Sequence, residues 1–281
     1  MQSGLHPSIH AFQASQWDAL NPSAYPGLLH GFLSALEDSK SVGEGTGWTP
    51  LYATVKDGDA LVGAMVCFLK SDSYGEYVFD WSWADAYHRH GLNYYPKCVT
   101  AIPFTPATGP RLLIQDGYDR GVVTELLIKT LKSELRDQVS SWHILFPDEE
   151  TSRDLLTQGS WLKRHGVQFH WFNQGFETFD DHLATFNSKR RKEARRERRR
   201  VQEQGIEFER LSGHAIDREA LETLFQCYQM TYRVRGSRGY LTRAFFDLVV
   251  ARIPDAIKVA FALHQRKRIA TTFCFTDQTH I

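Results

Sequence analysis

Two carboxylates are embedded among the five aromatic rings of residues 71–84. Glu76 and Asp80 are the carboxylates, and aromatic walls that exclude water can raise the pKa of a carboxyl group toward that of a useful general base. The same composition also fits a core segment in which the tips of Tyr and Trp side chains and the two carboxylates satisfy one another. The segment therefore predicts either a proton-accepting site, with Glu76 or Asp80 as the base, or a polar cluster inside the core.

A cation-bearing loop region follows this segment. Lys97 ends the run Tyr-Tyr-Pro-Lys, and Arg111 ends a stretch of prolines and a glycine at 103–111. Prolines fix a non-repetitive backbone, and loops of that kind often present ligands. Lys97 and Arg111 are expected either to meet a phosphate or carboxylate there, to be ordinary surface charges, or to pair with Glu76 or Asp80. The candidate substrate-binding residues of the region are Tyr77, Trp83, Tyr95, Lys97, Phe104, Thr105 and Arg111.

The strongest electrostatic feature is the run 189–200, in which nine of twelve residues are cationic. The chain as a whole has 33 basic and 33 acidic residues, so attraction to phosphate must be local. The run suits RNA, a nucleotide tail or a lipid pyrophosphate. The alternative is a solvated helix, partly neutralised by Glu193 and Glu197. The candidate polyanion-binding residues are Lys189, Arg190, Arg191 and Arg195.

Several classes of chemistry lack their signatures. The four cysteines form no C-x-x-C pair and are expected to be buried and reduced, and the histidines show no metal spacing with a third ligand, so no metal is expected. No G-x-S-x-G elbow or Walker loop occurs. The first residues lack a signal-peptide pattern, and no eighteen apolar residues run together, so a cytoplasmic protein without a membrane span is expected.

Residues 1–180 are expected to form a first domain, a mixed sheet flanked by helices. Apolar spacing and turn signals predict these elements. In order they are a helix at 26–38, an antiparallel hairpin of 51–55 and 61–69, a strand at 111–114, a helix after Gly121, a strand at 141–146, a helix capped by Asp148, and strands at 168–172 and 176–179. This order is typical of an α/β (α+β) domain.

Residues 181–205 change abruptly in composition and are expected to form a basic helical connection. Residues 206–281 then predict a strand at 206–211, helices at 216–232 and 242–252, and a hairpin of 258–263 and 269–275. Val259, Phe261 and Leu263 are expected to face Ile269, Phe273 and Phe275 across that hairpin. One strand, two helices and a hairpin make half of a sheet domain, so we expect this second domain to be truncated and more chain to follow.

Four blocks in one order resemble the FemAB-like (peptidoglycan biosynthesis/recognition) family of tandem GNAT-fold proteins. They are GTGWTP at 45–50, GEYVFD at 75–80 with YYPK at 94–97, PFTP at 103–106, and QFHW at 168–171 followed by the basic run. The resemblance implies two GNAT-like domains and transfer of an acyl or aminoacyl group to an amine. It implies acyl-CoA or aminoacyl-tRNA as donor, with tRNA as a possible partner and a small-molecule or peptide amine as acceptor.

One feature of the sequence disfavours coenzyme A binding by the first domain. The pyrophosphate loop of acyl-CoA enzymes would fall near 115–121, where this sequence places Asp116 and Asp119. In the second domain the corresponding loop would lie beyond Ile281.

Two functions from different classes therefore stay open. An N-acyltransferase or aminoacyltransferase predicts a pocket containing Glu76, Asp80, Tyr95 and Lys97. A non-catalytic module that holds RNA or a cell-wall precursor through its basic helix predicts salt-sensitive binding without turnover. Whether Glu76 or Asp80 faces a cavity or is sealed in the core separates them.

Overall fold

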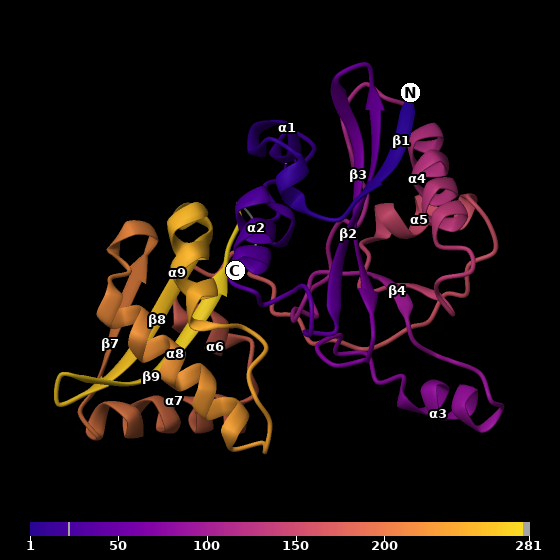
Figure 1. Cartoon of the computed structure of the whole chain (residues 1–281). Coiled ribbons are helices and arrows are strands. Elements are labelled where there is room, and N and C mark those ends of the chain that lie inside the picture. Colours follow the sequence, from indigo (N-terminus) through magenta and orange to yellow (C-terminus); the bar gives the residue numbers. More distant parts are fainter. Residues whose placement is uncertain (22, 278–281) are drawn as a thin grey trace.

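The chain folds into two sheets with helices packed beside them, as a computed structural model that describes residues 1–21 and 23–277 shows (Figure 1). The larger sheet has the order β1-β2-β3-β4-β6, with β5 paired to β3. Its strands are β1 Gln2–His6, β2 Trp48–Asp57, β3 Ala60–Lys70, β4 Lys97–Thr100, β5 Leu113–Ile114 and β6 Trp142–Ile144. β4 and β6 are parallel and the other pairs antiparallel, so the expected mixed sheet is confirmed.

The expected helices of this part are present at nearly the expected positions. The α-helices are α1 Ala14–Asp18, α2 His30–Asp38, α3 Trp81–Arg89, α4 Arg120–Glu134 and α5 Glu149–Thr157, of which α2, α4 and α5 are the expected ones. α4 covers the sheet with Val123, Leu127 and Leu131, all buried and spaced one helical turn apart. The Asp119 side chain accepts a hydrogen bond from the Val122 amide at the N-terminus of α4, and Asp148 caps α5 as predicted. Short 3₁₀ turns occur at η1 Ile9–Ala11, η2 Pro26–Leu28, η3 Gly213–Ala215 and η4 Pro254–Ala256.

The second sheet is a three-stranded antiparallel sheet with the order β7-β8-β9. The elements from the connection onward are α6 Phe179–Ala184, α7 Ser188–Glu203, β7 Ile206–Ser212, α8 Arg218–Arg233, α9 Arg243–Arg252, β8 Ile257–His264 and β9 Lys267–Phe275. The predicted strand, two helices and hairpin are confirmed. Ile269 does not face the hairpin core, however, because a bulge skips it between the pairs Ala262↔Ala270 and Leu263↔Arg268 and leaves it 54% exposed.

The two sheets share one apolar core, which runs through the contact between α2 and α9. Phe32 on α2 meets Phe245 and Phe275 edge-on, at ring separations of 5.8 and 5.3 Å. Thr242 caps α9 and also donates a hydrogen bond to the Ser39 carbonyl across the interface. The early helix at 30–38 thus anchors the late part of the chain.

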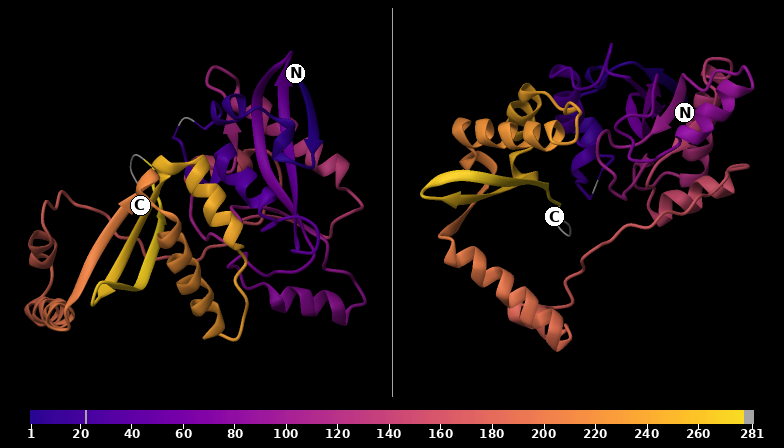
Figure 2. Two further views of the ribbon diagram at one scale, coloured as in Figure 1. Left: turned by 60° about the vertical axis from the view of Figure 1, so that its left-hand side comes forward. Right: turned by 90° about the horizontal axis from the view of Figure 1, so that it is seen from below.

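Residues 160–178 and the basic connection differ from the expectation. The predicted strands at 168–172 and 176–179 are wrong, because the chain there is extended without any ladder partner and Phe179 begins α6. The connection is two helices, with Asn187 capping α7. Both helices stand away from the sheets, joined to β6 and α5 by the extended segment (Figure 2). The sequence also failed to predict β1, α1, α3 and β4.

Candidate functional site

Lys97 forms the centre of a buried ionic cluster. The ammonium of Lys97, the first residue of β4, donates hydrogen bonds to Ser73 Oγ at 2.9 Å, to Glu76 Oε2 at 2.9 Å, and to Asp80 Oδ2. The side chains of Lys97 and Glu76 are fully buried and that of Asp80 is 3% exposed. Lys97 is therefore an ion-pair partner of both carboxylates, one of the three roles predicted for it.

The two carboxyl groups differ in acidity. Burial raises the pKa of Glu76, and the nearby Lys97 only partly offsets this. Burial opposes ionisation of Asp80 as well, but hydrogen bonds from Lys97, Ser73 and Tyr94 outweigh it, so the pKa of Asp80 is lowered. Glu76 Oε1 and Asp80 Oδ1 are buried and have no hydrogen-bond partner among the described residues. Glu76 is thus the better proton acceptor of the two near neutral pH.

A second buried lysine lies in the same region. Lys70, the last residue of β3, places its ammonium 4.0 Å from the Trp48 ring centroid and donates hydrogen bonds to Asp72 and to the Tyr74 carbonyl. Burial lowers the pKa of Lys70 to about 8, although Asp72 and Glu76 act in the opposite direction. The region therefore holds two cations and two carboxylates, Glu76 and Asp80, away from water.

Aromatic rings from both parts of the chain meet near Lys70, since Phe104 packs against Trp48, the ring next to the Lys70 ammonium. The Tyr77 hydroxyl lies 3.4 Å from that of Tyr232 at the end of α8, and Phe104 stacks on Tyr240 with ring centroids 5.0 Å apart. Tyr77 and Phe104 both adopt positive φ, near +60°, which is strained for bulky residues. Position 75 must be glycine, because a Cβ there would lie 2.7 Å from the Phe104 ring. Tyr232 and Tyr240 were not predicted, because no local pattern marks them.

Of the remaining predicted binding residues, Tyr95 joins the Lys97 cluster through Ser73, and the others lie apart from it. Trp83 on α3 is 45% exposed and lies under the Arg164 guanidinium at 5.1 Å, while the Tyr95 hydroxyl bonds Ser73 Oγ at 2.7 Å. Thr105 bonds its own loop at the Pro103 carbonyl. Arg111 is only 2% exposed and donates to the carbonyls of 107, 110 and 145, so it holds the loop together and does not face solvent.

Two surface cavities, of about 290 and 390 Å³, lie elsewhere. Neither contains Glu76, Asp80, Tyr95 or Lys97. The first lies between α6 and α7, and the second lies beside the β8–β9 turn.

The basic helix α7 uses its predicted residues unequally. Arg191 donates to the carbonyls of Leu183, Ala184 and Phe186 and so caps α6, and Arg195 forms an ion pair with Asp180 at 3.1 Å. Lys189 and Arg190 are exposed. Arg196 to Glu193, at 4.0 Å, is the one ion pair within the helix among the described residues. The positive charge of α7 is therefore largely uncompensated.

Metal and membrane features are absent from the described part of the chain. Between residues 1 and 277, leaving out 22, no cluster of three His, Cys, Asp or Glu side chains has metal-binding geometry. Over the same residues, no helix combines the length and apolar composition needed to cross a bilayer. Cys67 and Cys98 are buried as expected, whereas Cys227 and Cys274 are half-buried, and all four are free thiols.

The fold and the site define a mixed α/β protein with a buried lysine–carboxylate cluster beneath aromatic rings. A family model described as peptidoglycan biosynthesis/recognition, FemAB-like, matches residues 8–281, and the chain belongs to that family. Among solved structures, the crystal structure of FemX is similar, with 14% identity and a TM-score of 0.44. The alignment covers 93% of this chain and 57% of the FemX chain, so this chain spans little more than half of FemX. No curated protein matches the sequence.

Proposed function

We propose that this protein is an acyltransferase-like member of the FemAB/GNAT type that transfers an acyl or aminoacyl group to an amine on a cell-wall precursor. In this proposal residues 1–180 and 206–281 belong to two GNAT-like domains, and 181–205 connects them. The family membership supports the cell-wall acceptor. The observation that carries the proposal is Glu76, a carboxyl group with a raised pKa and one oxygen without a hydrogen-bond partner among the described residues. Its neighbour Tyr77 contacts Tyr232 from the other part of the chain.

Glu76 would act as the base. The acceptor nitrogen attacks the carbonyl carbon of a thioester or ester donor, a C–N bond forms, and the C–S or C–O bond breaks. Glu76 accepts the proton that the amine loses and then passes it to the leaving thiolate or alkoxide, which restores the carboxylate. Asp80, with its lowered pKa, would keep Lys97 charged and in place.

In this proposal, Glu76, which is buried, becomes accessible when the aromatic contact opens. Tyr77 follows Glu76 in the chain and touches Tyr232 through a hydroxyl contact of 3.4 Å, a weak hydrogen bond. Separation of these two rings would admit an acceptor amine. The substrate-binding role of Tyr77, Trp83, Tyr95, Phe104 and Thr105 belongs to the same proposal.

A second candidate is a binding module that performs no transfer. The burial of both carboxylates and the uncompensated charge of α7 favour it. In that case Lys189, Arg190, Arg191 and Arg195 would contribute to holding a polyanion or a cell-wall precursor, and the Lys97 cluster would only shape the 71–80 loop.

A transfer assay separates the two candidates. The protein is incubated with a peptidoglycan stem peptide that carries a free amine, and with acetyl-CoA or an aminoacyl-tRNA as donor, and the peptide mass is followed. A mass gain of one acyl or aminoacyl group supports transfer. Retention of the peptide without any mass gain for either donor supports the binding module.

A further inference from the structure

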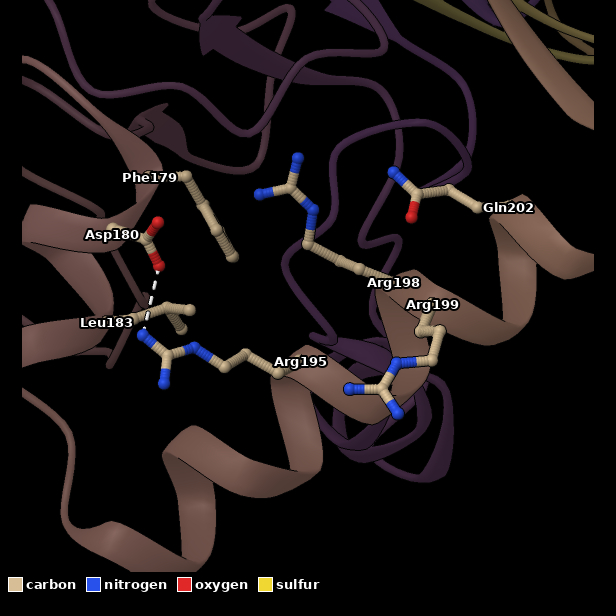
Figure 3. A pocket seen from close by; sticks show the side chains of 7 residues that line it. All are labelled: Phe179, Asp180, Leu183, Arg195, Arg198, Arg199 and Gln202. Carbon is tan, nitrogen blue, oxygen red and sulfur yellow. Dashed lines mark hydrogen bonds and ion pairs between the residues drawn. The ribbon is translucent and has the colours of Figure 1, made fainter.

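Three arginine side chains of α7 line the cavity between α6 and α7. Arg195, Arg198, Arg199 and Gln202 of α7 line this cavity, and Figure 3 shows Arg195 reaching toward Asp180 and Arg198 lying beside Phe179, while Arg199 extends from α7 in another direction. Phe179, Asp180 and Leu183 of α6 form the other wall. Positions 195, 198, 199 and 202 repeat at helical spacing, so they share one face of α7. The cavity has a volume of about 290 Å³.

The charge in this cavity is not balanced. Asp180 is the one carboxylate in its wall, and it pairs with Arg195 at 3.1 Å. Arg198 lies over the Phe179 ring at 4.0 Å, a cation–π contact that leaves its N–H groups at the edge free to donate. Arg199 has no ion pair or hydrogen bond from its side chain within the described residues. Three guanidinium groups against one carboxylate leave a surplus of two positive charges.

The α6 wall is held in place independently of any ligand. Leu183 is 1% exposed, and Arg191 fixes the carbonyls at the end of α6. Thr178 and Asp181 form a reciprocal capping box at its start. The cavity therefore keeps its shape without a ligand, with apolar side chains from α6 and cationic side chains from α7 in its wall.

We propose that this α6–α7 cavity is a binding site for a phosphate monoester or diphosphate group, held by Arg195, Arg198 and Arg199. Guanidinium groups bind phosphate oxygens in pairs, and a dianion matches the surplus charge. Gln202 adds an amide donor. The cavity volume fits one compact headgroup, and the basic residues on the opposite face of α7, Arg196 and Arg200, do not reach it. This inference narrows the polyanion role proposed above for α7 and holds whether or not Glu76 acts in transfer.

Titration calorimetry with sodium pyrophosphate, at constant ionic strength, tests the site. We expect one saturable site in the wild type. Arg198→Gln combined with Arg199→Gln should weaken binding about tenfold or more, because two charge-assisted donors are lost. Arg196→Gln combined with Arg200→Gln removes the same charge from the same helix and should leave affinity within about twofold.

A third variant guards against loss of folding as an explanation. Asp180→Asn frees Arg195 and removes the only carboxylate of the cavity, so it should tighten pyrophosphate binding, which a damaged fold would not do. Competition by ADP or by an isoprenyl diphosphate then distinguishes a nucleotide source of the diphosphate from a lipid source. Absence of pyrophosphate binding to the wild type would overturn the proposal. Equal weakening by the two double variants, or binding of an RNA oligonucleotide alone, would also overturn it in favour of a diffuse basic surface.

Discussion

Replacing Lys97 by methionine should lower the free energy of unfolding far more than the loss of one surface charge would. Methionine matches the length of the stem and leaves no cavity, but it removes the cation between two buried carboxylates. Glu76 would lose its only hydrogen-bond partner among the described residues, whereas Asp80 would keep the Tyr94 hydroxyl at 2.6 Å. Breaking a buried ion pair by removing one partner costs about 3–5 kcal/mol. We expect a loss of this size in the free energy of unfolding at pH 7.

The pH dependence gives this prediction its sharper form. Without Lys97, the folded-state pKa of Glu76 rises further above its unfolded value. An acid with a raised folded-state pKa destabilises the fold as pH rises between the two values, by up to about 1.4 kcal/mol per pH unit. The Lys97→Met protein should therefore lose less stability, relative to wild type, at pH 5 than at pH 7.

Urea unfolding at both pH values measures these differences. Lys129→Met, on the exposed side of α4, is the matched control and should change stability by about 0.5 kcal/mol or less. Adding Glu76→Gln to Lys97→Met should recover part of the loss. A loss below about 1 kcal/mol at pH 7, equal at pH 5, would refute the description of a buried, charged cluster.

Three further outcomes follow from other contacts. Because the pKa of Asp80 is lowered, its contribution to stability is present above the ordinary aspartate pKa and is lost as pH falls through the folded-state value. In acid unfolding between pH 5 and 3, the Asp80→Asn protein should therefore lose less stability than the wild type. Thr242→Ala should cost about 1–2 kcal/mol in urea unfolding, since Thr242 caps α9 and bonds the Ser39 carbonyl, whereas Thr242→Ser should cost little. Arg191→Lys should speed hydrogen exchange in α6, because the guanidinium contacts to the α6 carbonyls are lost; exchange as slow as in the wild type would contradict the capping role.

Local signals predicted most of the secondary structure. The spacing of Val123, Leu127 and Leu131 located α4, and the Asp-Gly pair located the β2–β3 hairpin, because these patterns act within one element. β1 was missed since its ladder partner lies fifty residues away at 52–56. The strands at 168–172 and 176–179 were predicted from composition alone, and apolar residues such as Phe169, fully exposed here, form no strand without a partner.

The candidate site was predicted only in part, because some of its contacts join residues far apart in the sequence. The sequence singled out Glu76, Asp80 and Lys97 and left open whether they pair, and the structure pairs them. Tyr232 and Tyr240 meet Tyr77 and Phe104 through the packing of the late part of the chain on α2, which no local pattern encodes. Arg198 and Arg199 were part of the recognised basic run, but the run alone does not reveal which face meets α6.

The most direct test of the proposed transfer is its rate as a function of pH in wild type, Glu76→Gln and Asp80→Asn, with stem peptide and whichever donor gives a mass gain. The proposal predicts a wild-type rate that rises through an apparent pKa above the usual glutamate range, and a loss of about a hundredfold or more in Glu76→Gln. Asp80→Asn should keep the larger share of the rate. A Glu76→Gln protein with the wild-type rate and pH profile, or a wild type that turns over neither donor, would contradict it.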